Sequence, residues 1–439
     1  MLEMILNAFR VKEMRNKILF TLFMLIIIRF GSNLPIPGVQ TDYFANLFGQ
    51  WSAQDAVGWL NSMTGGSFEQ LSVFALSITP YITSSIIMQL LTIAIPALEE
   101  IQKEGEDGRR KIAEYTRYVT VGLALIESTA MAIGFGGSGL LKEYNALSVI
   151  VCIVSMTAGS AFLMWVGERI TERGIGNGIS IVLMFNIISS LPKDGNVIFE
   201  RFLAGKSIAF QITYGLIIAG VLIAIIALSV ILEDARREIP VQYSGKLVGN
   251  ASSSGRGSVI PLKVNTAGVM PVIFASSIMS LPVIIAQFLD INYQSPIGFV
   301  IQFLNSGTWA NPNYPIYSLG LVLYIILVIF FAYFYTSITF NPNEVSSNIK
   351  KQGGFIPGIR PGKATADYLT SILNYIILIG AVGLTIVAVI PIIISGTFNI
   401  SRLGFLGTSL LIVVGVTLET LEQIKSQLVI RNYKSFLSE

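Results

Sequence analysis

Residues 208–232 read IAFQITYGLIIAGVLIAIIALSVIL, a run of 25 residues without a single Asp, Glu, Lys or Arg. About 20 predominantly apolar residues suffice for an α-helix to cross a hydrocarbon core of roughly 30 Å. Comparable runs recur along the whole chain. We therefore expect ten membrane-spanning helices, over residues 18–34, 71–95, 117–135, 146–166, 178–191, 208–232, 267–289, 316–337, 370–394 and 405–418.

The bulk composition also points to a lipid environment. Of the 439 residues, 53% are hydrophobic and 13% are charged, and the mean hydropathy is +0.68. An average soluble domain carries about 25% charged residues. A soluble fold could not bury this much apolar surface in one core, so the bilayer is the expected solvent.

The residue types that the chain lacks exclude several classes of enzyme. There is no histidine, and the one cysteine, Cys152, lies inside an apolar run. These two facts exclude a Ser-His dyad, a disulfide framework and a thiolate metal site. The sequence has no phosphate loop of the GxxxxGK[ST] type, and the ten expected spans lack the aspartates of an intramembrane aspartyl protease. We expect no catalytic residue, no metal and no cofactor.

The distribution of Lys and Arg predicts the orientation. With the N-terminus inside, 23 of the 29 basic residues fall in inside segments and five in outside loops, and Arg29 lies within the first span. Cytoplasmic loops of membrane proteins are enriched in Lys and Arg. Both termini are therefore expected in the cytoplasm.

Ionisable residues are scarce inside the expected spans. Arg29 and Glu127 lie within spans, and Arg117 lies at a boundary. Such residues at membrane depth usually mark proton relays or ion sites, and a coupled transporter would need more of them. Arg29 is expected to snorkel toward an interface or to pair with an acid, and Glu127 to face a polar seam. A passive conduit, driven by energy from elsewhere, fits this pattern.

The outside stretch 35–70 is unusual for a connection between spans. It carries no Lys or Arg, and its semi-apolar part, residues 57–66, is too short and too rich in glycine to span. This part is either an ordinary surface loop or a re-entrant segment, which requires protein or water around it.

Two inside loops, 233–266 and 338–367, are longer than connections need to be. The first contains a flexible, serine-rich tip at 251–257, and the second a stretch of turn-forming residues at 353–362. Judged by charge, these loops are either solvated spacers or landing surfaces for an acidic partner or ribosomal RNA.

Several separated strings resemble one family, the SecY family of protein-translocation channels. In chain order they are LPIPG (34–38), FALSITPYI (74–82), IIMQLL (86–91), KEGE (103–106) with GRRK (108–111), ERGIGNG (172–178), PLKVN (261–265), FIPGIRPG (355–362) and GTSLLI (407–412). The resemblance covers essentially the whole chain, in family order and with similar spacing.

The resemblance implies an all-α integral membrane protein with ten transmembrane helices in two pseudo-symmetric five-helix halves, an hourglass channel. Residues 1–192 would form the N-terminal half, 193–207 an external hinge loop, and 208–439 the C-terminal half. The implied function is passive: unfolded secretory polypeptides cross the membrane, and hydrophobic segments leave sideways into lipid. The alternative is an inverted-repeat secondary transporter for a small solute, which would need a compact polar site at the midplane.

The resemblance also assigns site residues. Branched apolar side chains would close the pore as a ring that seals by dewetting: Ile82, Ile86, Ile179, Leu183, Ile273 and Ile412. A re-entrant plug, residues 58–68, would block the pore from outside with Gly58, Leu60, Asn61, Met63, Gly65, Gly66 and Phe68. A lateral gate between spans two and seven, with three and eight beside them, would include Ile87, Gln89, Glu127 and Asn265. A motor or ribosome would contact Arg256, Arg360, Lys350 and Lys351.

The implied partners are the small subunits SecE and SecG, the motor ATPase SecA, the ribosome, an unfolded preprotein with a signal sequence, and membrane lipid. The implied location is the bacterial plasma membrane. The chain departs from the family pattern at Ser77 and Thr79, where a glycine and a bulky apolar residue are expected beside Pro80. The tip around Arg256 carries only that one basic residue between Lys246 and Lys263, which weakens the case for ribosome docking.

Overall fold

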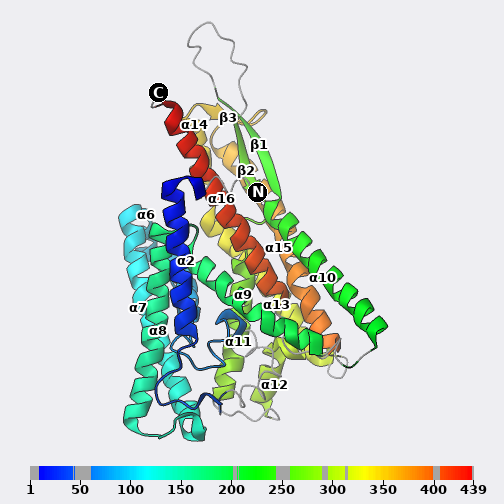
Figure 1. Ribbon diagram of the computed structural model, residues 1–439. Coiled ribbons are helices and arrows are strands. Elements are labelled where there is room, and N and C mark those ends of the chain that lie inside the picture. Colours follow the sequence, from blue (N-terminus) through cyan, green and yellow to red (C-terminus); the bar gives the residue numbers. More distant parts are fainter. Residues whose placement is uncertain are drawn as a thin grey trace.

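The structure is a computed structural model that describes residues 9–42, 44, 61–200, 205, 207–243, 258–288, 295–311, 315–398 and 406–437. Long helices dominate it (Figure 1). Each of the ten expected ranges overlaps one: α2 (Lys12–Ser32), α5 (Thr79–Ala94), α7 (Glu106–Phe135), α8 (Ala146–Arg173), α9 (Gly178–Ile198), α10 (Ile208–Asp234), α11 (Met270–Phe288), α13 (Leu319–Thr339), α15 (Lys363–Phe398) and α16 (Leu406–Leu437). The short helices are α6 (Pro96–Lys103), α12 (Pro296–Leu304), α14 (Pro342–Lys351), η1 (Gly136–Leu140), η3 (Ser306–Thr308) and η4 (Pro315–Ser318).

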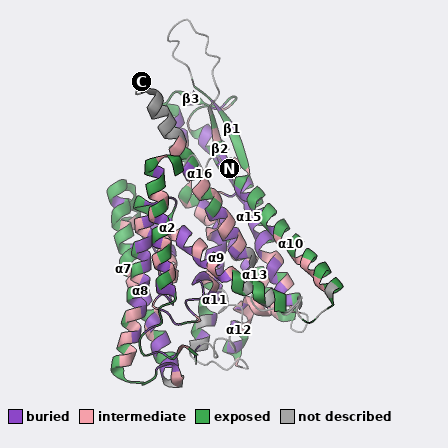
Figure 2. Ribbon diagram, viewed as in Figure 1, coloured by how far each residue is buried: buried purple, intermediate pink, exposed green. Residues whose placement is uncertain are grey.

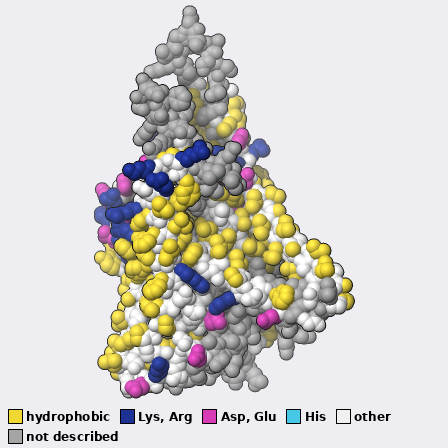
Figure 3. Space-filling view, viewed as in Figure 1, with side chains coloured by type: hydrophobic (Ala, Val, Ile, Leu, Met, Phe, Trp, Pro, Cys, Tyr) yellow, Lys and Arg dark blue, Asp and Glu magenta, His cyan; other side chains and the backbone are white. Residues whose placement is uncertain are grey.

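Five helical segments among the described residues are long and apolar enough, taken singly, to cross a membrane. They are Glu106–Phe135, Ala146–Arg173, Ala209–Asp234, Pro315–Lys351 and Lys363–Thr397. A sixth arises if α5 and α6 count as one span, although they meet at a bend of 101°. The outer surface carries exposed apolar side chains, as contact with lipid requires. On α10, the side chains of Ile212, Leu216 and Ile223 are 59%, 69% and 66% exposed. Figure 2 shows this exposed character along α10, and hydrophobic side chains cover much of the face in Figure 3.

The second expected span begins later than its apolar run suggests. Residues 73–78 form turns, and α5 begins only at Thr79. Pro80 occupies the first turn of α5, a position that suits proline because the first N–H groups of a helix lack intrahelical partners. Leu71 and Ser77 adopt left-handed backbone conformations, with φ of 43° and 51°. A helix cannot pass through these two residues, so the prediction of a continuous span from residue 71 is wrong.

The helices pack as two sets. In the first, α7 packs against α5 and α8, and α8 packs against α2 and α9. In the second, α13 packs against α11 and α15, and α16 packs against α10 and α15. The two sets touch where α9 packs against α16 and α7 packs against α11. Figure 1 shows α2, α7 and α8 on one side of the molecule and α10 and α15 on the other.

A small antiparallel sheet joins the two long loops, which the sequence did not predict. Its strands β1 (Arg236–Tyr243), β2 (Ser258–Lys263) and β3 (Gly354–Phe355) lie in the order β2-β1-β3, with Ile239 opposite Ile260. Side chains buried under the sheet and against α14 include Ile239, Val241, Leu262, Ile349 and Ile356. The two loops are therefore one packed unit over these residues.

Close backbone approach between helices depends on glycine. A Cβ atom built at Gly159 of α8 would lie 1.9 Å from the carbonyl oxygen of Val73, in the turns before α5. At Gly122 of α7, nothing lies within 4 Å of such an atom. Both glycines are inside helices, but only Gly159 is required by its surroundings.

We predict opposite effects of alanine at these two positions. Gly159→Ala forces α8 away from Val73 and should cost about 1–3 kcal/mol of stability, as overpacking does. Gly122→Ala gains helix propensity without a clash and should be neutral or stabilising by up to about 1 kcal/mol. Thermal unfolding of the purified protein in detergent would measure both. Equal midpoints for the two variants would contradict the close contact at Gly159.

Candidate functional site

A cavity lies between the two sets of helices. Its volume is about 710 Å³, and α5, α7, α8, α9, α10, α11, α13 and α16 all contribute to its lining. Part of the wall is apolar and comes largely from the first turns of α5, α9 and α11. The rest is polar or charged and comes from α5, α7, α8, α10, α16 and β2.

The apolar wall contains most of the expected ring. Five of its six residues line the cavity: Ile82, Ile179, Leu183, Ile273 and Ile412. They come from four helices, α5, α9, α11 and α16. Ile86 does not line the cavity; its side chain is 5% exposed and packs in the surrounding core. The structure therefore brings together five of the residues that the sequence grouped and places the sixth beside them in the packing.

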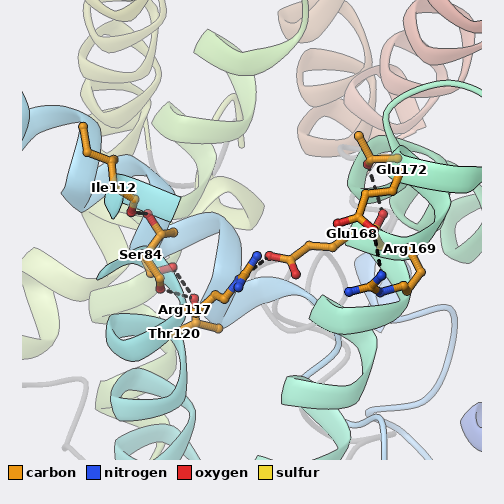
Figure 4. Close-up of polar contacts among 10 residues, drawn as sticks. Ser84, Ile112, Arg117, Thr120, Glu168, Arg169 and Glu172 are labelled. Carbon is orange, nitrogen blue, oxygen red and sulfur yellow. Dashed lines mark hydrogen bonds and ion pairs between the residues drawn. The ribbon is translucent and has the colours of Figure 1, made fainter. Parts of the chain in front are cut away.

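On one charged side of the cavity, polar contacts tie three helices together. The Arg117 guanidinium on α7 donates to Glu168 on α8, with 2.7 Å between Nε and Oε1. The hydroxyl groups of Ser84 on α5 and Thr120 on α7 lie 2.5 Å apart. Figure 4 shows both contacts, with Glu168 pointing from α8 toward Arg117. Arg117, predicted at a span boundary, is thus paired with an acid.

On the opposite charged side, Lys263 of β2 and Glu422 of α16 form an ion pair of 2.7 Å. Arg236 of β1 binds the same carboxylate. These contacts fix the base of the small sheet to α16.

The expected gate residues divide into two groups. Gln89 and Asn265 line the cavity, whereas Ile87 and Glu127 are half-buried outside its lining. The Asn265 side chain donates to the Glu233 carboxylate over 2.7 Å, so its partner belongs to α10 of the same set of helices. The sequence reasoning missed Glu233, because it follows an apolar run and reads as the first residue of a loop.

The described part of the expected plug, residues 61–68, is packed inside the molecule. Asn61, Met63 and Phe68 are buried. Gly65 and Gly66 have φ of 67° and 85°, a region that favours glycine. Gly58 and Leu60 lie outside the described residues.

Side chains from two helices hold this stretch. The Asn186 amide on α9 donates to the carbonyl oxygen of Met63 over 3.2 Å. The Arg29 guanidinium on α2 donates to the carbonyl oxygen of Gly65, also over 3.2 Å. Arg29 therefore binds a backbone carbonyl, a partner that the sequence reasoning did not consider. The sequence reasoning also missed Asn186, because its hydrogen-bond partners are far away in the sequence.

Three of the four expected motor or ribosome contacts are described. Lys350 and Lys351 end α14, Arg360 follows β3, and all three are exposed. The Ser346 hydroxyl donates to the carbonyl oxygen of Gly362 over 2.7 Å, which holds the turn-rich stretch against α14. Arg256 lies outside the described residues. Within the described part of the chain, no group of three or more His, Cys, Asp or Glu side chains could hold a metal ion.

Comparison with known proteins identifies the family. The family model for SecY matches residues 72–421. The protein translocase subunit SecY of Streptomyces galbus is 43% identical over 449 aligned positions, which cover 100% of both chains. The chain belongs to the SecY family. It is accordingly a subunit of a protein translocase and forms a protein-conducting channel; a solute transporter is not favoured.

Solved structures of the family share the fold. One is a SecY protein in which the plug domain stabilises the closed channel and maintains a membrane seal. It aligns with a TM-score of 0.65 and 20% identity, covering 94% of this chain and 92% of that one. Another is Sec61 in the canine ribosome-channel complex, with a TM-score of 0.61 and 18% identity, covering 94% and 93%.

The cavity geometry predicts which ring positions water reaches. In a Cys152→Ala background, the thiol of Ile82→Cys should react with a small water-soluble reagent roughly tenfold faster than that of Ile86→Cys, because thiolate forms where water has access. Mass spectrometry of the labelled protein would give both rates, and denatured protein would serve as the control for reagent and thiol. Equal rates in the folded protein would contradict the placement of Ile86 outside the cavity.

Proposed function

We propose that the 710 Å³ cavity is the cytoplasmic vestibule of the channel and that the ring closes its inner end. The observation that carries this proposal is the convergence of five branched apolar side chains from four helices on one cavity. Such a ring excludes ions by dewetting and yields around a passing chain without binding it. Ile86 supports the ring from behind.

In the proposed membrane arrangement all ten long helices span, with both termini in the cytoplasm. Residues 1–192 and 208–439 form two halves, and 193–207 is an external hinge. The contacts support this division, because most helix pairs pack within one set. The basic bias of the predicted inside segments supports the orientation. The location would be the bacterial plasma membrane, as the bacterial source of the related subunit suggests.

Residues 58–68 would form the plug, on the outer side of the ring. Burial of residues 61–68 and two glycines in left-handed conformations support a segment that is packed when the channel is closed and can refold when it leaves. The related SecY structure, whose plug domain stabilises the closed state, supports the same role here.

The lateral gate would open between α5 and α11, with α7 and α13 beside them. The contact between α7 and α11 closes that seam. Gln89 and Asn265 would present polar groups to the vestibule, while Ile87 and Glu127 would lie on the gate helices behind them. Hydrophobic segments of the substrate would leave here for lipid.

The proposed partners follow the family. SecE would clamp the two halves and SecG would be an accessory, while SecA or the ribosome would deliver the unfolded preprotein. Sec61 in the canine complex is bound to a ribosome, which supports a ribosome contact here. Lys350, Lys351 and Arg360 would supply basic groups for that contact, together with Arg256.

Removing the branched side chains of the ring should open a leak. The double substitution Ile82→Gly and Ile412→Gly is expected to raise the resting ion conductance of reconstituted vesicles by roughly tenfold, because water then wets the constriction. Ile126→Gly, at a side chain that is 67% exposed on α7, controls for glycine in a helix. Unchanged resting conductance in the double variant would contradict the assignment of these residues to the ring.

Reversing the charge of Arg360 should weaken the motor contact. Arg360→Glu is expected to lower SecA-driven export by several-fold and to leave assembly with SecE intact, because the side chain is exposed and its loop is held through backbone atoms. Arg109→Glu makes the same charge change at an exposed position of α7 and serves as the control. Normal export by Arg360→Glu would refute the assigned role.

A further inference from the structure

Asn186 lies on the pore-facing side of α9. It follows Ile179 and Leu183 at spacings of seven and three residues, so all three share one helix face. The side chains of Ile179 and Leu183 line the cavity, whereas the Asn186 side chain is buried, with 3% of its surface exposed. A buried amide on an apolar helix needs hydrogen-bond partners, because an unpaired polar group there is costly.

Asn186 finds those partners in two separate segments. Its side-chain nitrogen donates to the carbonyl oxygen of Met63 over 3.2 Å and to the Ser77 hydroxyl over 3.0 Å. Met63 belongs to the plug, and Ser77 lies two residues before α5. An asparagine amide carries two N–H donors, so one side chain can serve both acceptors.

The fit around Asn186 is close on the plug side as well. A Cβ atom built at Gly65 would lie 3.1 Å from the Asn186 Cα atom. Gly65 therefore rests directly on the backbone of α9. The plug contacts α9 through both backbone packing and the Asn186 amide.

Ser77 stands where the family pattern has a glycine, and its φ of 51° is one that a serine rarely adopts. Two side chains hold it there. Its hydroxyl accepts from Asn186, and its carbonyl oxygen accepts from the Ser160 hydroxyl on α8 over 3.1 Å. The residue that replaces glycine is thus the residue that binds Asn186.

We propose that Asn186 and Ser77 form a polar latch that couples the plug to the first turn of α5. The proposal rests on the proposed function, in which residues 58–68 are the plug and α5 is a gate helix. Movement of α5 toward an open gate carries Ser77 away from Asn186. Asn186 then holds the plug through Met63 alone, and the plug is freed more easily.

The test reads the position of the plug directly. Ser67→Cys, in a Cys152→Ala background, places one thiol in the plug at a side chain that is 1% exposed. Its rate of reaction with a membrane-impermeant maleimide is measured in reconstituted vesicles that contain the full chain with its partner subunits. Resting ion conductance is measured on the same vesicles.

Asn186→Ala is expected to raise the labelling rate by about tenfold, because two neutral hydrogen bonds are lost. Ser77→Gly is expected to raise it by a smaller factor, since one bond is lost and glycine suits the backbone there. Ser77→Gly also keeps the test valid if Asn186→Ala does not fold. The control is Ser190→Ala, which removes a buried hydroxyl of α9 that bonds within its own helix, to Ile187.

The double variant Asn186→Ala, Ser77→Gly should label no faster than Asn186→Ala alone, because both substitutions remove the same hydrogen bond between residues 186 and 77. Additive effects, or labelling that is unchanged in Asn186→Ala and Ser77→Gly, would overturn the latch. Faster labelling together with higher conductance supports the latch and the plug. Faster labelling at unchanged conductance supports the latch and overturns the proposed role of the plug.

Discussion

Backbone polar groups at membrane depth must find partners inside the protein, and the irregular stretches of this chain are arranged around that constraint. The stretches 34–40 and 71–73 bond to each other, with 3.1 Å from the Ile36 nitrogen to the Leu71 oxygen and 2.9 Å from the Val73 nitrogen to the Leu34 oxygen. The carbonyl groups of Met63 and Gly65 are reached by side chains of α9 and α2 instead. The arginine inside the first span thus completes the bonding of irregular backbone and is no sign of an ion pathway.

The same constraint separates the two walls of the cavity. Charged side chains of the lining pair with one another, as Arg117 does with Glu168 and Lys263 with Glu422. The first turns of α5, α9 and α11 present branched apolar groups instead, and such groups do not bind ions. In the proposed channel this separation matters, because a charge at the proposed constriction would bind the chain that has to pass.

The sequence predicted the long helices because lipid demands apolar runs of nearly constant length, a signal that is local. It grouped the residues of the proposed ring only through family resemblance, since spacing places Ile82 and Ile86 on one helix face but does not say what that face meets. It misplaced the start of α5, because residues 71–78 are apolar and only Pro80 hints at a boundary. The sheet, Glu233 and Asn186 depend on contacts between distant segments, which periodicity cannot reveal; Asn186 and Met63 are 123 residues apart.

Ser77, before α5, combines a left-handed backbone conformation with a hydrogen bond from Asn186. A non-glycine residue in the left-handed region costs roughly 1–2 kcal/mol, and one neutral hydrogen bond returns about 0.5–1.5 kcal/mol. The two contributions are similar in size, so the conformation of Ser77 depends on the bonds from Asn186 and Ser160. Glycine at this position would hold the turn without any partner. Replacing it with serine makes the start of α5 sensitive to the position of α9, and through Met63 to residues 61–68.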